Sequence, residues 1–271
     1  MHRRDFLGSA GISAIACLAG LLYPRITFSD DKIIAGNLYL YDADSHLSEN
    51  ELNSTFTSAI KVFEDNGIYF NKATILNENE FPQLSGLDIL LCAVDNHPST
   101  GLFGINTWYN SDDINGKNPS LSTNEDYKTM KQRLGFPYDQ TTAEAHMGYI
   151  CPETFFRKIK TRQSLPDEAE LSSGDRILGI TNLIVHEVSH GLGASHVKNV
   201  YVKDVKGYIR IPSPDDYLGD VYSIKRKRFI EENIEKMREF CDYIRNNQVE
   251  DDELIEIRER MTRRYYYFPS N

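Results

Sequence analysis

Cysteine is scarce in this chain, with four among 271 residues, and only Cys92, Cys151 and Cys241 lie beyond position 30. Three cysteines allow one disulfide at most, so a small fold held together by a disulfide framework is excluded. Hydrophobic residues make up 40% of the chain, which indicates instead a globular domain with a core of its own.

Basic residues are also in short supply, with 30 lysines and arginines against 40 aspartates and glutamates. If residues 1–29 are removed, as predicted below, 27 basic and 39 acidic residues remain and the formal charge is −12. A chain of this charge lacks the basic surface that DNA or RNA requires, so we expect no nucleic-acid partner.

The chain has no apolar run of ordinary membrane-spanning length. Phe6 to Tyr23 is 18 residues long and contains several small residues, whereas a hydrocarbon core of roughly 30 Å needs about 20 apolar residues. Arg3 and Arg4 precede this run and Pro24 ends it, which is the layout of an export signal. The paired arginines followed by Phe-Leu resemble the twin-arginine signal, which in bacteria exports folded proteins.

We therefore predict that residues 1–29 are an export signal peptide, cleaved near Ser29, and that residues 30–271 form one domain. The mature protein would be periplasmic or extracellular and would have no stable association with the membrane. Two alternatives are a retained membrane anchor and a lipoprotein attached through Cys17.

The hydrophobic pattern predicts strands, a capped helix, more strands and a long helix. Ser48 and Glu51 form a capping box, and apolar residues recur at helical spacing from there to Gly67. The run Leu87–Val94 is typical of a buried central strand. The other predicted strands are Lys32–Tyr41, Ile68–Leu76, Leu102–Tyr109 and Met147–Cys151, and the other predicted helices are Glu125–Leu134, one capped by Ser173 or Asp175, and Lys225–Asn246.

The most specific feature is the segment from His186 to His196, which lies at the end of the helix capped near Ser173. On a helix, His186 and His190 lie on one face and can approach one cation, with Glu187 beside them. A helix that continued to His196 would carry it roughly 15 Å away from His186 along the axis. Gly193 can end the helix, because glycine adopts the left-handed conformation, and the chain can then turn back.

Three neutral imidazoles with an open fourth position describe a catalytic zinc site. Zinc polarises a carbonyl group and lowers the pKa of bound water to about 7, and Glu187 can take up the proton as general base. The pattern therefore predicts hydrolysis of a peptide bond.

This segment resembles the signature HExxHxxGxxH of the metzincin clan of zinc endopeptidases, which His186, Glu187, His190, Gly193 and His196 match at every fixed position. The resemblance implies one Zn²⁺ held by the three histidines, with Glu187 as the catalytic residue and Gly193 as the structural turn. It also implies an α+β fold, in which a twisted mixed sheet with a backing helix and an active-site helix precedes a smaller, mostly helical C-terminal subdomain. The upper subdomain would cover about residues 32–193 and the lower one about residues 194–271.

The sequence departs from the family in one respect, because Val197–Tyr222 contains no methionine for the turn that metzincins have beneath the metal. Leu218 or Val221 is the expected hydrophobic replacement. A tyrosine that stabilises the oxyanion could be Tyr201, Tyr217 or Tyr222, and the spacing does not choose among them.

Family analogy also makes the predicted strand at 101–109 the sheet edge above the cleft, where an extended polypeptide substrate could bind through its main chain. A second cation, Ca²⁺, is weakly suggested by Ser111–Gly116, although Ser122 stands where a calcium loop needs glutamate. The alternatives to a zinc endopeptidase are a non-catalytic, zinc-stabilised binding protein on a metzincin scaffold and a zinc hydrolase that acts on other amides.

Overall fold

The structure is a computed structural model that describes residues 32–44, 47–77, 80–94, 124–166, 168–195, 200–204, 207–211, 216–219 and 224–263. The chain divides into two units, Met1–Asp31 and Lys32–Asn271, and all described residues belong to the second unit. The predicted export signal, the predicted strand at 101–109 and the weak calcium motif at 111–116 therefore lie outside the described residues.

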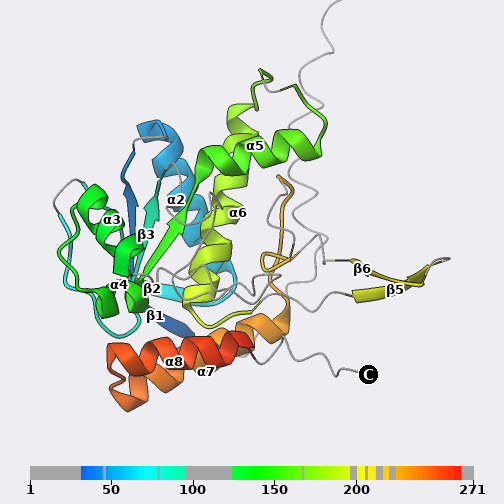
Figure 1. Ribbon diagram of the computed structural model, residues 1–271. Coiled ribbons are helices and arrows are strands. Elements are labelled where there is room, and N and C mark those ends of the chain that lie inside the picture. Colours follow the sequence, from blue (N-terminus) through cyan, green and yellow to red (C-terminus); the bar gives the residue numbers. More distant parts are fainter. Residues whose placement is uncertain are drawn as a thin grey trace, which may run out of the picture. The chain divides into compact units, whose positions relative to one another are not determined.

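A parallel sheet forms the centre of the described unit (Figure 1). Its strands are β1 (Ile33–Asp42), β2 (Ile68–Ile75), β3 (Ile89–Ala93) and β4 (Met147–Ile150), in the order β2-β1-β3-β4. Each neighbouring pair is parallel; for example, Leu38 of β1 lies opposite Ala73 on one side and Ile89 on the other. All five residues of β3 are buried, which confirms the prediction of a central strand.

These four strands confirm the predicted positions to within two residues at each end. The mixed character expected of the sheet is not seen among its four described strands, since β2, β1, β3 and β4 pair only in parallel. Parallel neighbours require crossover connections, and the first of these is the helix between β1 and β2.

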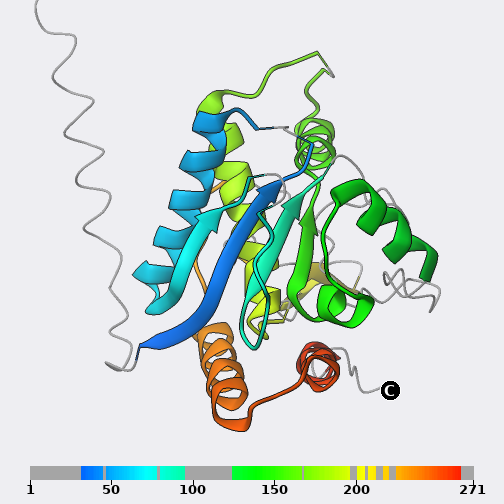
Figure 2. The same cartoon turned by 90° about the vertical axis from the view of Figure 1, so that its left-hand side faces the viewer.

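Two helices, α2 (Glu49–Asp65) and α6 (Ser173–Gly191), lie side by side against the sheet (Figures 1 and 2). The predicted capping box of α2 is confirmed, because the Ser48 side chain accepts a hydrogen bond from the Glu51 N–H and the Glu51 side chain accepts one from the Ser48 N–H. The expected cap of α6 was wrong by one residue or more. Ser172 is the N-cap, and its hydroxyl oxygen accepts a hydrogen bond from the Asp175 N–H.

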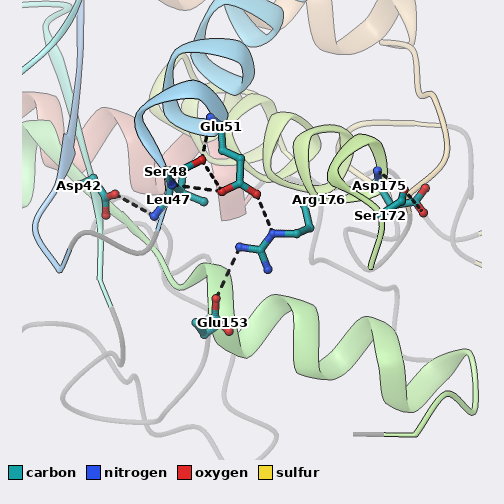
Figure 3. Close-up of polar contacts among 8 residues, drawn as sticks. All are labelled: Asp42, Leu47, Ser48, Glu51, Glu153, Ser172, Asp175 and Arg176. Carbon is teal, nitrogen blue, oxygen red and sulfur yellow. Dashed lines mark hydrogen bonds and ion pairs between the residues drawn. The ribbon is translucent and has the colours of Figure 1, made fainter. Parts of the chain in front are cut away.

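An ion-pair network joins the N-terminal ends of α2, α6 and α5 (Pro152–Arg162), as Figure 3 shows. Arg176 of α6 donates from Nε to Glu51 Oε1 at 2.8 Å, and its guanidinium lies 3.9 Å from Glu153 Oε1 of α5. The same guanidinium stacks over the Phe156 ring at 4.3 Å. These contacts hold the start of α6 against its two neighbours, α2 and α5.

The remaining elements correct several predictions. The helix expected at Lys225–Asn246 begins only at Glu231, so the basic run at 225–228 precedes it. The backbone of Arg228 instead forms an isolated parallel β-bridge with Asp216. Helices at 140–146, 152–162 and 251–263 and a hairpin were not predicted individually. The helix predicted at Glu125–Leu134 is confirmed as α3 (Asn124–Leu134). The other elements are α4 (Gln140–His146), α5, α7 (Glu231–Asn247), α8 (Asp251–Arg263), β5 (Val200–Asp204) and β6 (Gly207–Ile211).

The described unit thus combines a parallel sheet with helices and agrees with the α+β class that was predicted. Within the part of the chain that the structure describes, no helix combines the length and the apolar character needed to cross a bilayer.

Candidate metal centre

The last two turns of α6 bring two histidine rings together. His186 and His190 are 5% and 1% exposed, their ring centroids are 4.7 Å apart and the rings are nearly perpendicular. The two Nε2 atoms are 3.2 Å apart. The separation of four residues on a helix places both rings on one face, as the sequence predicted.

The other nitrogen of each ring faces a backbone carbonyl. His186 Nδ1 lies 2.6 Å from the oxygen of Tyr217, and His190 Nδ1 lies 2.9 Å from the oxygen of Ala194. A carbonyl oxygen only accepts hydrogen bonds, so each Nδ1 must carry the proton and donate it. In the neutral rings, both Nε2 atoms therefore present lone pairs to each other.

Two facing lone pairs at this distance repel unless a positive charge lies between them. Tetrahedral zinc with Zn–N bonds of about 2.0–2.1 Å places two ligand atoms about 3.3 Å apart, close to the observed 3.2 Å. The Nδ1 bonds to carbonyl groups are the outer contacts that metal-ligating histidines usually make. The donor set of His186 and His190 therefore fits a zinc ion.

Burial shifts the pKa values of His190 and Glu187. Desolvation lowers the pKa of His190 to about 4, although its bond to Ala194 opposes the shift, so the ring is neutral at pH 7 and can act as a ligand. Glu187 is 2% exposed and its Oε1 lies 3.9 Å from His186 Nε2. Burial raises the pKa of this carboxyl group well above its ordinary value of 4.5, because desolvation makes its carboxylate a stronger proton acceptor.

The helix ends immediately after His190. Leu192 is the C-cap of α6, and Gly193 has a φ of +84°, in the left-handed region. A Cβ atom at Gly193 would lie 2.8 Å from the Cβ and Cγ atoms of Phe240 in α7. Glycine is thus required here both by the backbone conformation and by the packing, and the chain reverses so that the Ala194 carbonyl reaches His190.

A second turn, formed by Asp216, Tyr217, Leu218 and Gly219, supports His186. The Asp216 carboxylate accepts hydrogen bonds from the N–H groups of Leu218 at 2.6 Å and Ile230 at 2.9 Å. Leu218, one of the two residues proposed to replace the missing methionine, is 1% exposed. Sequence reasoning did not single out Asp216 or the Tyr217 carbonyl, although Asp-x-x-Gly is a recognisable turn pattern.

Tyr217 is the one candidate oxyanion tyrosine whose side chain is described. Its ring is 6% exposed and packs on Phe229, with centroids 4.8 Å apart. Burial raises the pKa of its hydroxyl group to about 12. The side chain of Tyr201, and Tyr222 and Val221 entirely, lie outside the described residues, as does the candidate third ligand His196.

Within the described ranges, no group of three or more His, Cys, Asp and Glu side chains is arranged to hold a metal ion. The described part of the centre consists of two histidines, Glu187 and the two turns at Gly191–Ser195 and Asp216–Gly219. Other histidines are either packed, as His146 is between Asp88 and Asp251, or, as His46 and His97, outside the described ranges.

Comparison of the chain with models of known protein families gave no match, and a search of curated proteins found no matching sequence. The case for a function therefore depends on the motif and on the geometry of this centre.

Proposed function

We propose that this protein is an exported, zinc-dependent endopeptidase of the metzincin type. The observation that carries the proposal is the pair of histidine Nε2 atoms 3.2 Å apart, each on a ring whose Nδ1 donates to a backbone carbonyl. The motif adds His196 as the third ligand. A cation bound between the two Nε2 atoms would explain why both rings are held at this distance while each Nδ1 donates to a carbonyl.

The three histidines would hold the ion, and a bound zinc ion supplies a Lewis acid that polarises the substrate carbonyl and makes water more acidic. The backbone carbonyls of Tyr217 and Ala194 keep His186 and His190 in the tautomer that can ligate. The neutral state of His190 at pH 7 means that little competition from protons is expected.

Glu187 is the group that moves the proton. Its carboxyl oxygen lies close to His186 Nε2, so it borders the space that an attacking water would occupy. Glu187 accepts a proton from that water and then delivers it to the peptide nitrogen as the C–N bond breaks. The buried surroundings that raise its pKa make it a stronger base than an exposed glutamate.

The proposed substrate is an extended polypeptide. Among the described strands, β2 and β4 form the edges of the sheet, and the segment 101–109 remains the proposed edge for binding substrate through main-chain hydrogen bonds. This mode of binding makes few demands on side chains, so a broad peptide substrate range is expected.

Glu187→Gln is the decisive variant. The mature protein should contain one zinc ion per chain and cleave casein or a proteome-derived peptide mixture, with cuts mapped by mass spectrometry, and a chelator should abolish cleavage. Glu187→Gln should keep the zinc and lose turnover by a factor of roughly 10³ or more, since it removes the base but no ligand. Glu235→Gln, an exposed change of the same chemistry in α7, should behave like the wild type.

Two other results would favour one of the alternative functions. Stoichiometric zinc without cleavage of any peptide would indicate a zinc-stabilised binding protein. Cleavage of small amides without proteolysis would indicate a hydrolase of non-peptide amides. A wild-type protein that contains no zinc when purified from zinc-supplemented medium would contradict all three interpretations.

A further inference from the structure

The turn that follows α6 is held by side chains from both C-terminal helices. In Figures 1 and 2, α7 and α8 lie next to the C-terminal end of α6. Arg258 of α8 donates from Nε to the Gly191 carbonyl at 3.0 Å, and Lys236 of α7 donates from Nζ to Ser195 Oγ at 2.7 Å. These two hydrogen bonds hold the first and last residues of the turn Gly191–Ser195.

Further contacts hold the Arg258 side chain in this position. Its side chain is fully buried, although burial lowers its pKa only to about 9, so it remains charged at pH 7. A second guanidinium nitrogen donates to the Ala145 carbonyl, and the guanidinium stacks on the Phe240 ring with a distance of 5.3 Å to its centroid. Phe240 is the same ring that packs against Gly193.

A buried cation is costly unless its donors are used, so Arg258 serves a purpose that an apolar residue could not. The Gly191 carbonyl is among the last four of α6, which have no partner within the helix and lie at the negative end of its dipole. A charged donor therefore stabilises the helix end and at the same time fixes the direction in which the chain leaves it.

One hydrogen bond connects the turn Gly191–Ser195 to the candidate metal centre. His190 Nδ1 donates to the carbonyl of Ala194, which lies between Gly191 and Ser195 in the turn. If the turn moves, this carbonyl moves with it, and His190 loses both its ring orientation and the preference for the Nδ1–H tautomer.

We propose that Arg258 and Lys236 are positioning residues for His190, and that the α7–α8 pair keeps the turn Gly191–Ser195 in the conformation that a metal ion requires. The inference rests on the proposed function for its metal, but the orientation of His190 can be measured in metal-free protein. The helices that follow the motif are then part of the centre, and not only a support for the core.

The test uses Arg258→Met and Lys236→Met, each of which removes the donors and keeps an unbranched chain, together with Arg258→Lys as the conservative variant. Arg176→Met is the matched control, because Arg176 also donates a hydrogen bond to another element, but at the opposite end of α6. Zinc affinity is measured by competition with a chromophoric chelator, and the coordination geometry from the visible spectrum of the Co²⁺-loaded protein. The tautomer of His190 is measured by ¹⁵N NMR of metal-free protein.

We expect Arg258→Met and Lys236→Met to weaken zinc binding by about 10- to 100-fold, the effect typical of outer contacts to metal ligands. The Co²⁺ spectrum should change, and His190 should lose its Nδ1–H signature. Arg258→Lys should recover part of the affinity, and Arg176→Met should lower stability without altering affinity or tautomer.

Folded Arg258→Met and Lys236→Met variants with wild-type zinc affinity and an unchanged His190 signature would overturn the inference. If Arg258→Met does not fold, Lys236→Met and Arg258→Lys decide the matter by the same readouts. If the wild type binds no zinc, the proposed function fails, whereas a His190 tautomer lost in these variants and kept in Arg176→Met still supports the positioning role.

Discussion

His186 Nδ1 donates a hydrogen bond of 2.6 Å to the carbonyl oxygen of Tyr217, which is 31 residues further along the chain. This bond ties α6 to the turn Asp216–Gly219 and fixes the ring nitrogen that carries the proton. The turn itself is held by Asp216, a 1% exposed side chain that accepts two backbone hydrogen bonds. The orientation of His186 therefore depends on Asp216, which acts on it only through the backbone of this turn.

Asp216→Ala should disrupt this support. The N–H groups of Leu218 and Ile230 would lose their acceptor, and two buried donors without partners cost roughly 2–5 kcal/mol in total. We expect a loss of this size in the free energy of unfolding, measured by urea denaturation with a chelator present. Zinc affinity of the folded variant should fall by about tenfold or more, because the Tyr217 carbonyl is no longer held against His186.

Asp216→Asn is the matched variant, since the amide oxygen can replace one acceptor while the NH₂ group faces the other donor. Its stability and its zinc affinity should both lie between those of the wild type and Asp216→Ala. An Asp216→Ala protein with unchanged zinc affinity would show that the turn is not needed to orient His186.

Gly193→Ala should be one of the more damaging single changes near the centre. The left-handed backbone costs an alanine about 1–2 kcal/mol, and the new Cβ would lie 2.8 Å from two Phe240 atoms, an overlap worth roughly 1–3 kcal/mol more. The free energy of unfolding, measured by urea denaturation, should therefore fall by the sum of both effects.

Gly135 provides the control, because its φ is +68° but a Cβ there would meet no atom within 4 Å. Gly135→Ala should show only the cost of the backbone conformation. Equal losses for the two substitutions would mean that Phe240 moves aside without cost, and that packing does not restrict residue 193.

The contrast between Gly193 and Asp216 shows how far the sequence could lead. The helical spacing of His186 and His190 and the position of Gly193 are local patterns, and local geometry fixes what they do. The support from Asp216 and Tyr217 depends on contacts between distant segments, which no periodicity reveals.

The same limit explains the errors in the fold. The four strands of the parallel sheet and the Ser48 capping box follow from short patterns and were predicted well. The run at 225–228 has a composition that suits a helix, but tertiary bonds override this propensity, since the Arg228 carbonyl accepts from the Tyr217 N–H and Asp216 takes the N–H of Ile230.

The three cysteines of the described unit should be unreactive in the folded protein. Among the described residues, no disulfide joins Cys92, Cys151 and Cys241, and each of these side chains is buried. Burial raises the pKa of Cys92 well above its ordinary value and that of Cys241 to about 12, so at pH 8 neither forms the reactive thiolate.

In a protein that starts at residue 30, a chromogenic disulfide reagent should therefore label less than one thiol per chain at pH 8, and three after denaturation. Lys61→Cys, at an exposed position of α2, should add one rapidly labelled thiol and so verify the assay. Rapid reaction of the native wild type would show that one of the three sites opens far more readily than its burial implies.

Glu51 should make stability depend on pH. Burial alone would raise the pKa of this carboxyl group, but hydrogen bonds from Arg176 and Ser48 outweigh it and hold the pKa below the ordinary value of 4.5 (Figure 3). A carboxyl group whose pKa is lower in the folded state stabilises the fold above its unfolded pKa, and this contribution is lost as the pH falls through the folded value.

Glu51→Gln isolates this charge, because glutamine can still complete the capping box with Ser48. The wild type should therefore be more stable than Glu51→Gln at pH 7, and the difference should shrink as the pH falls below about 4.5, in urea denaturation curves collected from pH 7 to pH 3. In an Arg176→Met background, the pH dependence of the same difference should be weaker, since the bond to Glu51 Oε1 is absent. A difference that stays constant across this range would mean that the carboxylate of Glu51 gains nothing from Arg176.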